Sequence, residues 1–219
     1  MANRMSFLGR NNSSSSILDG PRLFYHKVCL TGVSNVGKTS LFLRMKTGVF
    51  PDAQTVSTNG VDTQLLVRNV TGGKVGMSLN DTLGVEKCGT LTANYFKGAE
   101  CILFMFCIED QYSLESLDDA IKETSKHVTS STCLFYLVAN KVDLMSEITA
   151  DRVTEKQIEL DCKKVFYISA KTGEGIDELF DGIATDLNMK AVNTLPEVSR
   201  IQLHVTQTQG GHGDKKCAC

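Results

Sequence analysis

The sequence lacks the features that would direct it into a membrane or onto nucleic acid. No apolar run reaches the roughly 18 residues that a membrane-spanning helix needs. The polar N-terminus has no hydrophobic core of a signal peptide. Neither charge is in large excess, because 23 Lys and Arg face 25 Asp and Glu for a net charge of −2. This balance gives no reason to expect nucleic acid or strong attraction to anionic lipid, so we expect a soluble globular protein.

Zinc sites and disulfides are not expected either, although the chain has eight cysteines. No C-x-x-C pair suggests a zinc site. Cys29, Cys101, Cys107 and Cys133 fall inside predicted core strands, where cysteine packs as a small apolar side chain. We therefore expect these four residues in the core.

The pattern along the chain predicts one folded domain between two polar tails. The 219 residues are 42% hydrophobic, which is enough for one sizeable core. Residues 1–22 include a polar tract at 11–16 and are predicted to be a flexible extension. Within residues 23–187, strand-like and helix-like segments alternate, which predicts an α/β domain with a mostly parallel sheet. Residues 188–219 are predicted to be a variable, flexible tail.

The final helix of the domain shows one apolar face at helical spacing. We expect this face to pack in the core and to carry no functional site. Its residues are Ile176, Leu179, Phe180, Ile183 and Leu187.

A phosphate-binding loop stands between a predicted strand and a predicted helix. Residues 32–39 complete the pattern G-x-x-x-x-G-K-[ST], after a strand at 25–30 and before a helix that begins at 40–45. This order aims backbone N–H groups and a helix dipole at one anion. The alternative is a chance match in a glycine-bearing loop, and the flanking elements argue against it. The residues expected to bind nucleotide phosphates are Gly32, Ser34, Asn35, Val36, Gly37, Lys38, Thr39 and Ser40.

Two further motifs favour guanine over adenine. N-K-V-D at 140–143 follows the apolar run 133–139, which places it at the carboxyl end of a buried strand, where open α/β sheets bind ligands. Asp143 could accept from the ring N–H and the exocyclic amine of guanine, and adenine offers no such donor pair. S-A-K at 169–171 follows the strand 165–168 and can offer a backbone N–H to the guanine carbonyl oxygen. Alone, N-K-x-D is often a solvated loop, but three ordered motifs at strand ends indicate a guanine nucleotide site. The residues assigned to the base are Asn140, Lys141, Asp143, Ser169, Ala170 and Lys171.

With these motifs the sequence resembles a Ras-superfamily small GTPase, and within that superfamily it looks most like the Rab family. The resemblance covers residues 24–187 and includes S-T-N-G-V-D at 57–62, where the family has S-T-I-G-V-D. It also includes D-T-L-G at 81–84, where the family has D-T-A-G, and Y-F-K-G-A at 95–99, where the family has Y-Y-R-G-A. The chain ends in C-A-C at 217–219, a Rab-type terminus. The resemblance implies a single phosphate-loop GTPase domain with helices flanking its central sheet.

The resemblance also implies binding of GTP or GDP with Mg²⁺, and hydrolysis of GTP. Lys38 would reach the β- and γ-phosphates. Thr39, Thr58 and Asp81 would contact Mg²⁺, with Asp81 acting through a water. Thr58 would also close over the γ-phosphate, and the Gly84 N–H would bond a γ-phosphate oxygen, which makes Lys38, Thr58 and Gly84 the expected catalytic residues. The alternative for Asp81 is an ordinary turn residue at the end of a strand.

Loss of the γ-phosphate would relax the loops around 50–63 and 82–96, and partners would read that change. The family has Gln after D-T-A-G to orient the attacking water, but this chain has Val85. A valine side chain neither donates nor accepts a hydrogen bond, so we expect slow intrinsic hydrolysis. Two hypotheses stay open. One is a GTPase switch that is accelerated by an activating protein, and the other is a GTP-binding membrane adaptor that rarely hydrolyses.

The aromatic residues that Rab effectors contact are also replaced. The family has Trp before D-T-A-G and Phe after G-V-D, but this chain has Asn80 and Thr63. A largely polar patch is therefore expected, to which common Rab effectors should bind poorly. The aromatic residue expected at the guanine edge would fall at Pro51, and Phe50 could serve if the loop carried one extra residue.

The C-terminus predicts a lipid anchor. Cys217 and Cys219 do not form a C-a-a-X box, and the resemblance implies a geranylgeranyl group on each. Two such chains anchor stably, and Lys215 and Lys216 add slight attraction to anionic lipid. The alternative is a pair of free exposed thiols. The resemblance implies a monomer in vesicular trafficking that cycles between cytosol and the cytoplasmic face of an intracellular membrane. Its implied partners are an exchange factor, an activating protein, a GDP-dissociation inhibitor and effectors.

Overall fold

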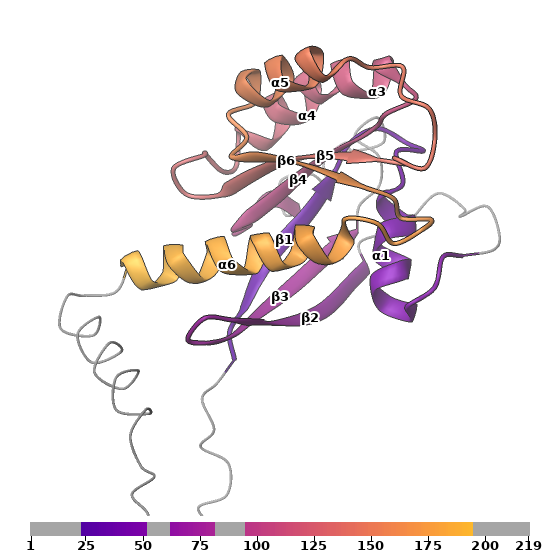
Figure 1. The fold of residues 1–219 in the computed structure, drawn as a ribbon. Coiled ribbons are helices and arrows are strands. Elements are labelled where there is room, and N and C mark those ends of the chain that lie inside the picture. The colour runs from indigo at the N-terminus through magenta and orange to yellow at the C-terminus, as the bar shows by residue number, and fades with distance from the viewer. Residues whose placement is uncertain (1–22, 52–61, 82–94, 195–219) are drawn as a thin grey trace, which may run out of the picture.

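The computed structural model describes residues 23–51, 62–81 and 95–194. Its centre is a six-stranded sheet with the order β2-β3-β1-β4-β5-β6 (Figure 1). Among the described strands, only β2 and β3 pair antiparallel, and every other neighbouring pair is parallel. This confirms the α/β class with a mostly parallel sheet. The strands are β1 (Tyr25–Thr31), β2 (Asp62–Val70), β3 (Gly73–Asp81), β4 (Cys101–Cys107), β5 (Leu134–Asn140) and β6 (Lys164–Ile168).

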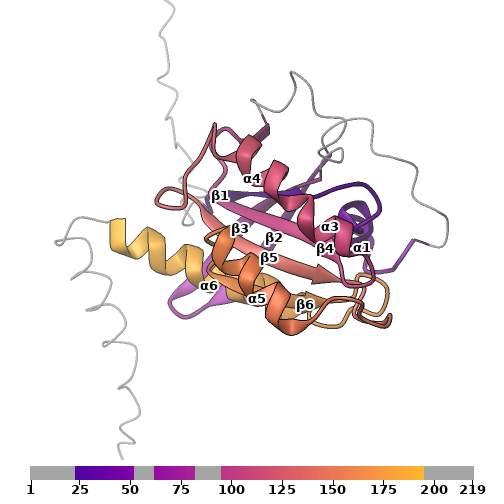
Figure 2. The same ribbon diagram turned by 90° about the horizontal axis from the view of Figure 1, so that it is seen from above.

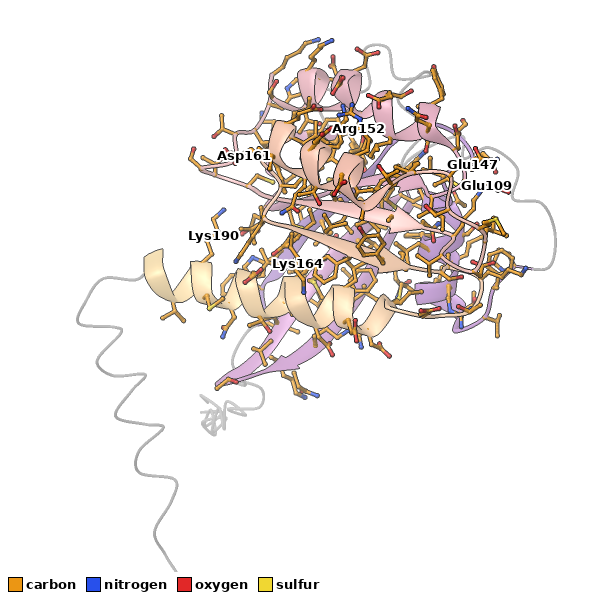
Figure 3. All side chains as sticks on the ribbon, turned by 45° about the horizontal axis from the view of Figure 1, so that its top comes forward. Glu109, Glu147, Arg152, Asp161, Lys164 and Lys190 are labelled. Atoms are coloured by element: carbon orange, nitrogen blue, oxygen red, sulfur yellow. The ribbon has the colours of Figure 1, made fainter. Side chains whose placement is uncertain are left out.

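Helices cover both faces of this sheet (Figures 1 and 2). The helices α1 and α6 pack on one face, and α3, α4 and α5 pack on the other, so each face has its own apolar core. Side chains fill both layers, and charged residues such as Glu109, Asp161 and Lys164 lie on the outside (Figure 3). The helices are α1 (Lys38–Thr47), α3 (Gln111–Glu115), α4 (Leu117–Thr124), α5 (Ala150–Glu159) and α6 (Ile176–Thr194).

The apolar runs of the sequence form the centre of the fold. Every residue of β4 is buried, as its unbroken apolar sequence predicts for a strand covered on both faces. The apolar face of the last helix, from Ile176 to Leu187, is at most 5% exposed and packs in the α1/α6 layer, which confirms that prediction. The helix itself continues beyond residue 187 to Thr194. The division of the chain at residues 22 and 187 stays a prediction.

The cysteines of the described region are buried thiols. Burial raises the pKa of Cys29 to about 11 and that of Cys133 to about 12. Such thiols are protonated and unreactive at neutral pH, in agreement with a packing role. Within the described residues, no group of three or more metal-ligating side chains is found, and no helix is long and apolar enough to span a bilayer.

The parallel strands all end at one edge of the sheet. The last residues of β1, β4, β5 and β6 are Thr31, Cys107, Asn140 and Ile168, and β3 ends alongside them at Asp81. The phosphate loop, N-K-V-D and S-A-K each begin where one of these strands ends. The fold therefore brings the three sequence motifs to a common edge, where open α/β sheets bind ligands.

Candidate nucleotide-binding site

The phosphate loop makes a tight turn that requires glycine at two positions. Gly32 and Gly37 have φ values of 143° and 97°. A Cβ on Gly32 would lie 2.3 Å from the Met105 carbonyl oxygen, because the loop runs directly against β4. A Cβ on Gly37 would lie 2.2 Å from the Asn140 Nδ2. Asn35 also has a positive φ, 66°, which asparagine tolerates better than most residues.

The ammonium group of Lys38 is held by the loop that precedes it. Its Nζ donates to the Gly32 carbonyl oxygen at 2.8 Å and to the Val33 carbonyl oxygen at 2.7 Å, and the residue is only 5% exposed. Lys38 also opens α1, so its positive charge is added to the positive end of the helix dipole. This arrangement suits an anion bound over the loop.

The oxygen ligands expected for Mg²⁺ come from two neighbouring elements. Thr39 stands in the first turn of α1, and Asp81 ends β3 with only 1% of its surface exposed. A carboxylate and a hydroxyl are donors that Mg²⁺ prefers, so this donor set fits the ion. Thr58, Gly84 and Val85 lie outside the described residues.

Asn140 joins the phosphate loop to the S-A-K loop. Its Nδ2 donates to the Val36 carbonyl oxygen at 2.8 Å, and its Oδ1 accepts from the Ala170 N–H at 3.0 Å. The side chain is 1% exposed, so both bonds are shielded from water. The sequence predicts that Asn140 contacts the base. In the structure Asn140 also connects the phosphate loop to the S-A-K loop.

Asp143 is oriented by the S-A-K loop. Its Oδ1 accepts from the Ser169 hydroxyl at 2.6 Å, and its Oδ2 lies 3.7 Å from the Lys171 Nζ. Ser169 Oγ in turn accepts from the Thr172 N–H at 3.0 Å. These contacts hold the Asp143 carboxylate beside the S-A-K loop, which is also predicted to contact the base. The Asp143 side chain is 13% exposed.

Arg44 on α1 is a contact of the S-A-K loop that the sequence analysis missed. Its guanidinium donates to the carbonyl oxygens of Ala170 at 3.2 Å, Lys171 at 2.9 Å and Thr172 at 3.0 Å. A signal was available, because Arg44 lies three residues after the buried Leu41 and so shares the inward side of the helix. A charged residue there needs a polar partner.

The predicted polar patch has an internal hydrogen bond. The Thr63 hydroxyl donates to the Asn80 Oδ1 at 2.9 Å, across directly paired positions of β2 and β3. Asn80 is 7% exposed, and its Nδ2 donates to the carbonyl oxygens of Val28 and Ser78. Thr63 is exposed, whereas Asn80 turns its amide towards the sheet backbone. The two side chains are polar, but the buried amide of Asn80 is used within the protein and is little exposed to a partner.

Two aromatic residues, Phe50 and Tyr95, lie next to the segments 52–61 and 82–94, which are outside the described residues. The Tyr95 hydroxyl donates to the Asn80 carbonyl oxygen at 2.7 Å, so the chain that follows residues 82–94 is attached to the end of β3. Phe50 follows α1 and is 37% exposed. Its contact with a base stays a prediction.

Asn140 connects the phosphate loop to the S-A-K loop at the carboxyl edge of a mostly parallel sheet, and this arrangement defines a phosphate-loop nucleotide-binding protein. Residues 27–189 match the Ras family. The chain is 33% identical to the Ras-related protein Rab-26 of Bos taurus over 87% of this chain and 74% of that protein. It is 29% identical to the Ras-related protein Rab-18 of Caenorhabditis elegans, over 88% of this chain and 94% of that protein. The chain belongs to the Ras family and is a divergent Rab-like small GTPase.

Proposed function

We propose that the chain is a guanine-nucleotide switch of membrane trafficking that hydrolyses GTP slowly. The observation that carries this proposal is the bridge through Asn140, because it couples the loop for phosphates to the loop for the base. In this proposal Asp143 accepts the two donors of guanine, and the loop at 169–171 donates to its carbonyl oxygen. Family membership supports the switch and its place in vesicle transport.

The phosphates would lie over the loop from Gly32 to Gly37 and the first turn of α1. Lys38 would exchange its two loop carbonyls for phosphate oxygens. Thr39, Thr58 and Asp81 would hold Mg²⁺, which when bound neutralises charge on the β- and γ-phosphates. Thr58 and the Gly84 N–H would complete the contacts to the γ-phosphate.

Val85 is the reason to expect slow hydrolysis. Losing one contact that positions the reacting groups typically slows an enzyme by about 100-fold or more. The second candidate function, a membrane adaptor that binds GTP and rarely hydrolyses it, is favoured by Val85. The switch is favoured by the intact set of Lys38, Thr39, Thr58 and Asp81.

Single-turnover hydrolysis separates these two functions. Protein loaded with GTP is followed for release of phosphate, with and without a cell extract that supplies an activating protein. We expect slow release alone and faster release with extract, and Val85→Gln should raise the rate without extract. Equal rates with and without extract, together with no gain from Val85→Gln, would favour the adaptor.

We further propose that geranylgeranyl groups on Cys217 and Cys219 hold the chain on a cytoplasmic membrane face. Each buried CH₂ contributes about 0.8 kcal/mol, so a cytosolic pool requires a GDP-dissociation inhibitor that covers both lipids. Removing the last three residues, 217–219, should move the protein wholly to the soluble fraction and leave GDP affinity unchanged. Unmodified thiols at both cysteines in the native protein, by mass spectrometry, would contradict the anchor.

A further inference from the structure

Arg44 reaches across the structure to hold three successive carbonyl groups. It lies on α1, and its guanidinium donates to the carbonyl oxygens of Ala170, Lys171 and Thr172, which are far from it in sequence. The loop is fitted closely around it, because a Cβ on Gly173 would lie 2.5 Å from the Arg44 Nη2. An arginine fork can bridge such a set of oxygens, whereas a lysine ammonium is a compact point charge.

This contact also sets the direction of the neighbouring N–H groups. In a trans peptide the C=O and the following N–H point in opposite directions. When Arg44 draws the carbonyls of residues 170–172 towards α1, the N–H groups of residues 171–173 face away from α1. Successive N–H groups on one side of a loop form a site that attracts an acceptor.

Ser169 takes two of these three N–H groups. Its Oγ accepts from the Thr172 N–H at 3.0 Å, and its carbonyl oxygen accepts from the Gly173 N–H at 2.8 Å. The N–H of Ala170 is already bound to Asn140. Among the described residues, no acceptor is found for the N–H of Lys171. One donor of the loop is thus left facing away from α1.

This donor belongs to the loop that also orients the Asp143 carboxylate. The carboxylate of Asp143 bonds the Ser169 hydroxyl, two residues before Lys171. On guanine the 6-oxo oxygen is next to the ring N–H and the exocyclic amine. If Asp143 takes those two donors, the adjacent position requires a donor for the oxygen.

We propose that Arg44 is a positioning residue for base recognition, which aims the Lys171 N–H at the 6-oxo oxygen of the purine. This inference rests on the proposed binding of guanine nucleotides. Arg44 itself does not contact the nucleotide. It acts by fixing the peptide between Ala170 and Lys171.

Three nucleotides test the inference through their release rates. GDP has both the 6-oxo and the 2-amino group, and IDP keeps the 6-oxo group but lacks the amine. The diphosphate of 2-aminopurine riboside keeps the amine but lacks the 6-oxo group and, with it, the ring N–H. Arg44→Ala should release GDP and IDP about tenfold faster, the effect of about one hydrogen bond, and should leave release of the 2-aminopurine nucleotide unchanged.

Lys46→Ala is the matched control, because Lys46 is an exposed cation on the same helix that lies over the Phe42 ring. It should leave all three rates unchanged. Arg44→Lys provides a second variant if Arg44→Ala does not fold, and it should speed GDP release less than alanine does.

Two results would overturn the inference while the proposed function stands. Equal acceleration for all three nucleotides would make Arg44 a general stabiliser of the fold. Unchanged GDP release in both Arg44 variants would mean that the loop needs no help from α1. If the wild-type protein itself does not retain GDP, the proposed function is wrong, and the inference falls with it.

Discussion

The base side and the hydrolysis side of the site differ in how closely they follow the Rab pattern. On the base side, N-K-V-D and S-A-K are intact, Asn140 is hydrogen-bonded to Val36 and Ala170, and Asp143 accepts from Ser169. On the hydrolysis side, Val85 replaces the expected glutamine. In the predicted effector patch, the Thr63–Asn80 pair replaces two aromatic residues. Retention of the nucleotide and its turnover are therefore separable properties in this chain.

The two sides depend on different kinds of structure. The base side is built from loops that begin at buried strands and bond one another, so contacts within the protein fix its geometry. The hydrolysis side depends on Thr58, Gly84 and Val85, which the family pattern alone assigns. Changes on the base side should therefore alter affinity, and changes on the hydrolysis side should alter rate.

We expect the greatest loss of GDP affinity from a substitution in the phosphate loop, where it packs against Asn140. Gly37→Ala places a methyl group 2.2 Å from the Asn140 Nδ2 at a φ of 97°. It should lower GDP affinity by about 100-fold or more, because the clash adds to the roughly 1–2 kcal/mol cost of the left-handed conformation. Titration calorimetry measures the loss.

Gly48→Ala is the control for Gly37→Ala. It also has a positive φ, 79°, but nothing lies within 4 Å of the added Cβ. It should cost about 1–2 kcal/mol of unfolding free energy and leave GDP affinity unchanged. Equal affinity losses for both variants would contradict the steric account.

A smaller loss of GDP affinity is expected when the phosphate loop and the S-A-K loop lose their connection through Asn140. Asn140→Ala leaves the Val36 carbonyl and the Ala170 N–H without their buried partner, at about 1–3 kcal/mol for each group. GDP affinity should fall by at least about tenfold, which corresponds to about 1.4 kcal/mol. Asn69→Ala, on the exposed part of β2, should change nothing. Unchanged affinity in Asn140→Ala would show that the bridge does not position the loops.

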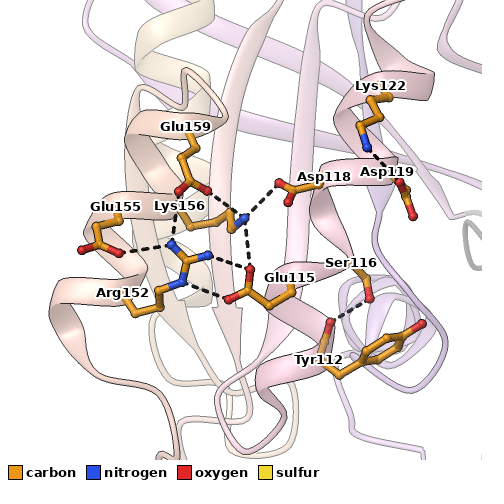
Figure 4. A network of polar contacts seen from close by, with 10 residues as sticks. All are labelled: Tyr112, Glu115, Ser116, Asp118, Asp119, Lys122, Arg152, Glu155, Lys156 and Glu159. Carbon is orange, nitrogen blue, oxygen red and sulfur yellow. Dashed lines mark hydrogen bonds and ion pairs between the residues drawn. The ribbon is translucent and has the colours of Figure 1, made fainter.

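An ion-pair network that joins α3, α4 and α5 tests whether stability and recognition are separate (Figure 4). The Lys156 Nζ lies 2.8 Å from Glu159, 2.9 Å from Asp118 and 3.4 Å from Glu115, and its side chain is 1% exposed. Burial acts to lower the pKa of Lys156, but its hydrogen bonds to Glu159 and Asp118 outweigh burial and raise that pKa. The raised pKa means that the charge on Lys156 stabilises the fold at neutral pH, and that this contribution is lost as the pH rises through the folded-state pKa in strong alkali.

Lys156→Ala should lower the unfolding free energy by about 1–2 kcal/mol, since its carboxylate partners stay partly hydrated. Lys122→Ala, which removes the exposed pair with Asp119, should cost less than about 0.5 kcal/mol. Urea unfolding measures both. Neither variant should change the preference for GTP over ATP, and a changed preference would show that stability and recognition are coupled.

The smallest effect is a pH dependence in the same network. The hydrogen bond from Arg152 lowers the pKa of Glu115 below its usual value of 4.5. A lowered folded-state pKa stabilises the fold above the usual pKa, and this stabilisation is lost as the pH falls through the lower folded value. Glu115→Gln should therefore cost less than about 1 kcal/mol at pH 7, and the difference from wild type should vanish in acid. Glu109→Gln at an exposed position is the control, and it should change the free energy of urea unfolding at pH 7 by less than about 0.5 kcal/mol.

Local patterns predicted the framework and the motifs. The strand at 101–107 has the bounds of the apolar run, because a fully buried strand needs every residue apolar. The three motifs meet because parallel strands end at one edge, which follows from the alternation of elements.

Contacts between distant elements could not be predicted in the same way. The bond from Arg44 to Ala170 joins positions 126 residues apart and depends on the side from which α1 approaches the loop. The inward turn of the Asn80 amide depends on the register of three strands. Periodicity identifies which face of an element is buried, but it does not identify the polar group that the face meets.

The preference for guanine is measured by comparing the binding of GTP and ATP in the presence of Mg²⁺. We expect titration calorimetry to detect tight binding of GTP and GDP and no comparable binding of ATP, because adenine cannot supply the two donors that Asp143 accepts. Asp143→Asn should weaken GTP and admit the xanthine nucleotide, whose ring presents an acceptor where guanine presents the amine. Equal affinity of the wild-type protein for ATP and GTP would contradict the account.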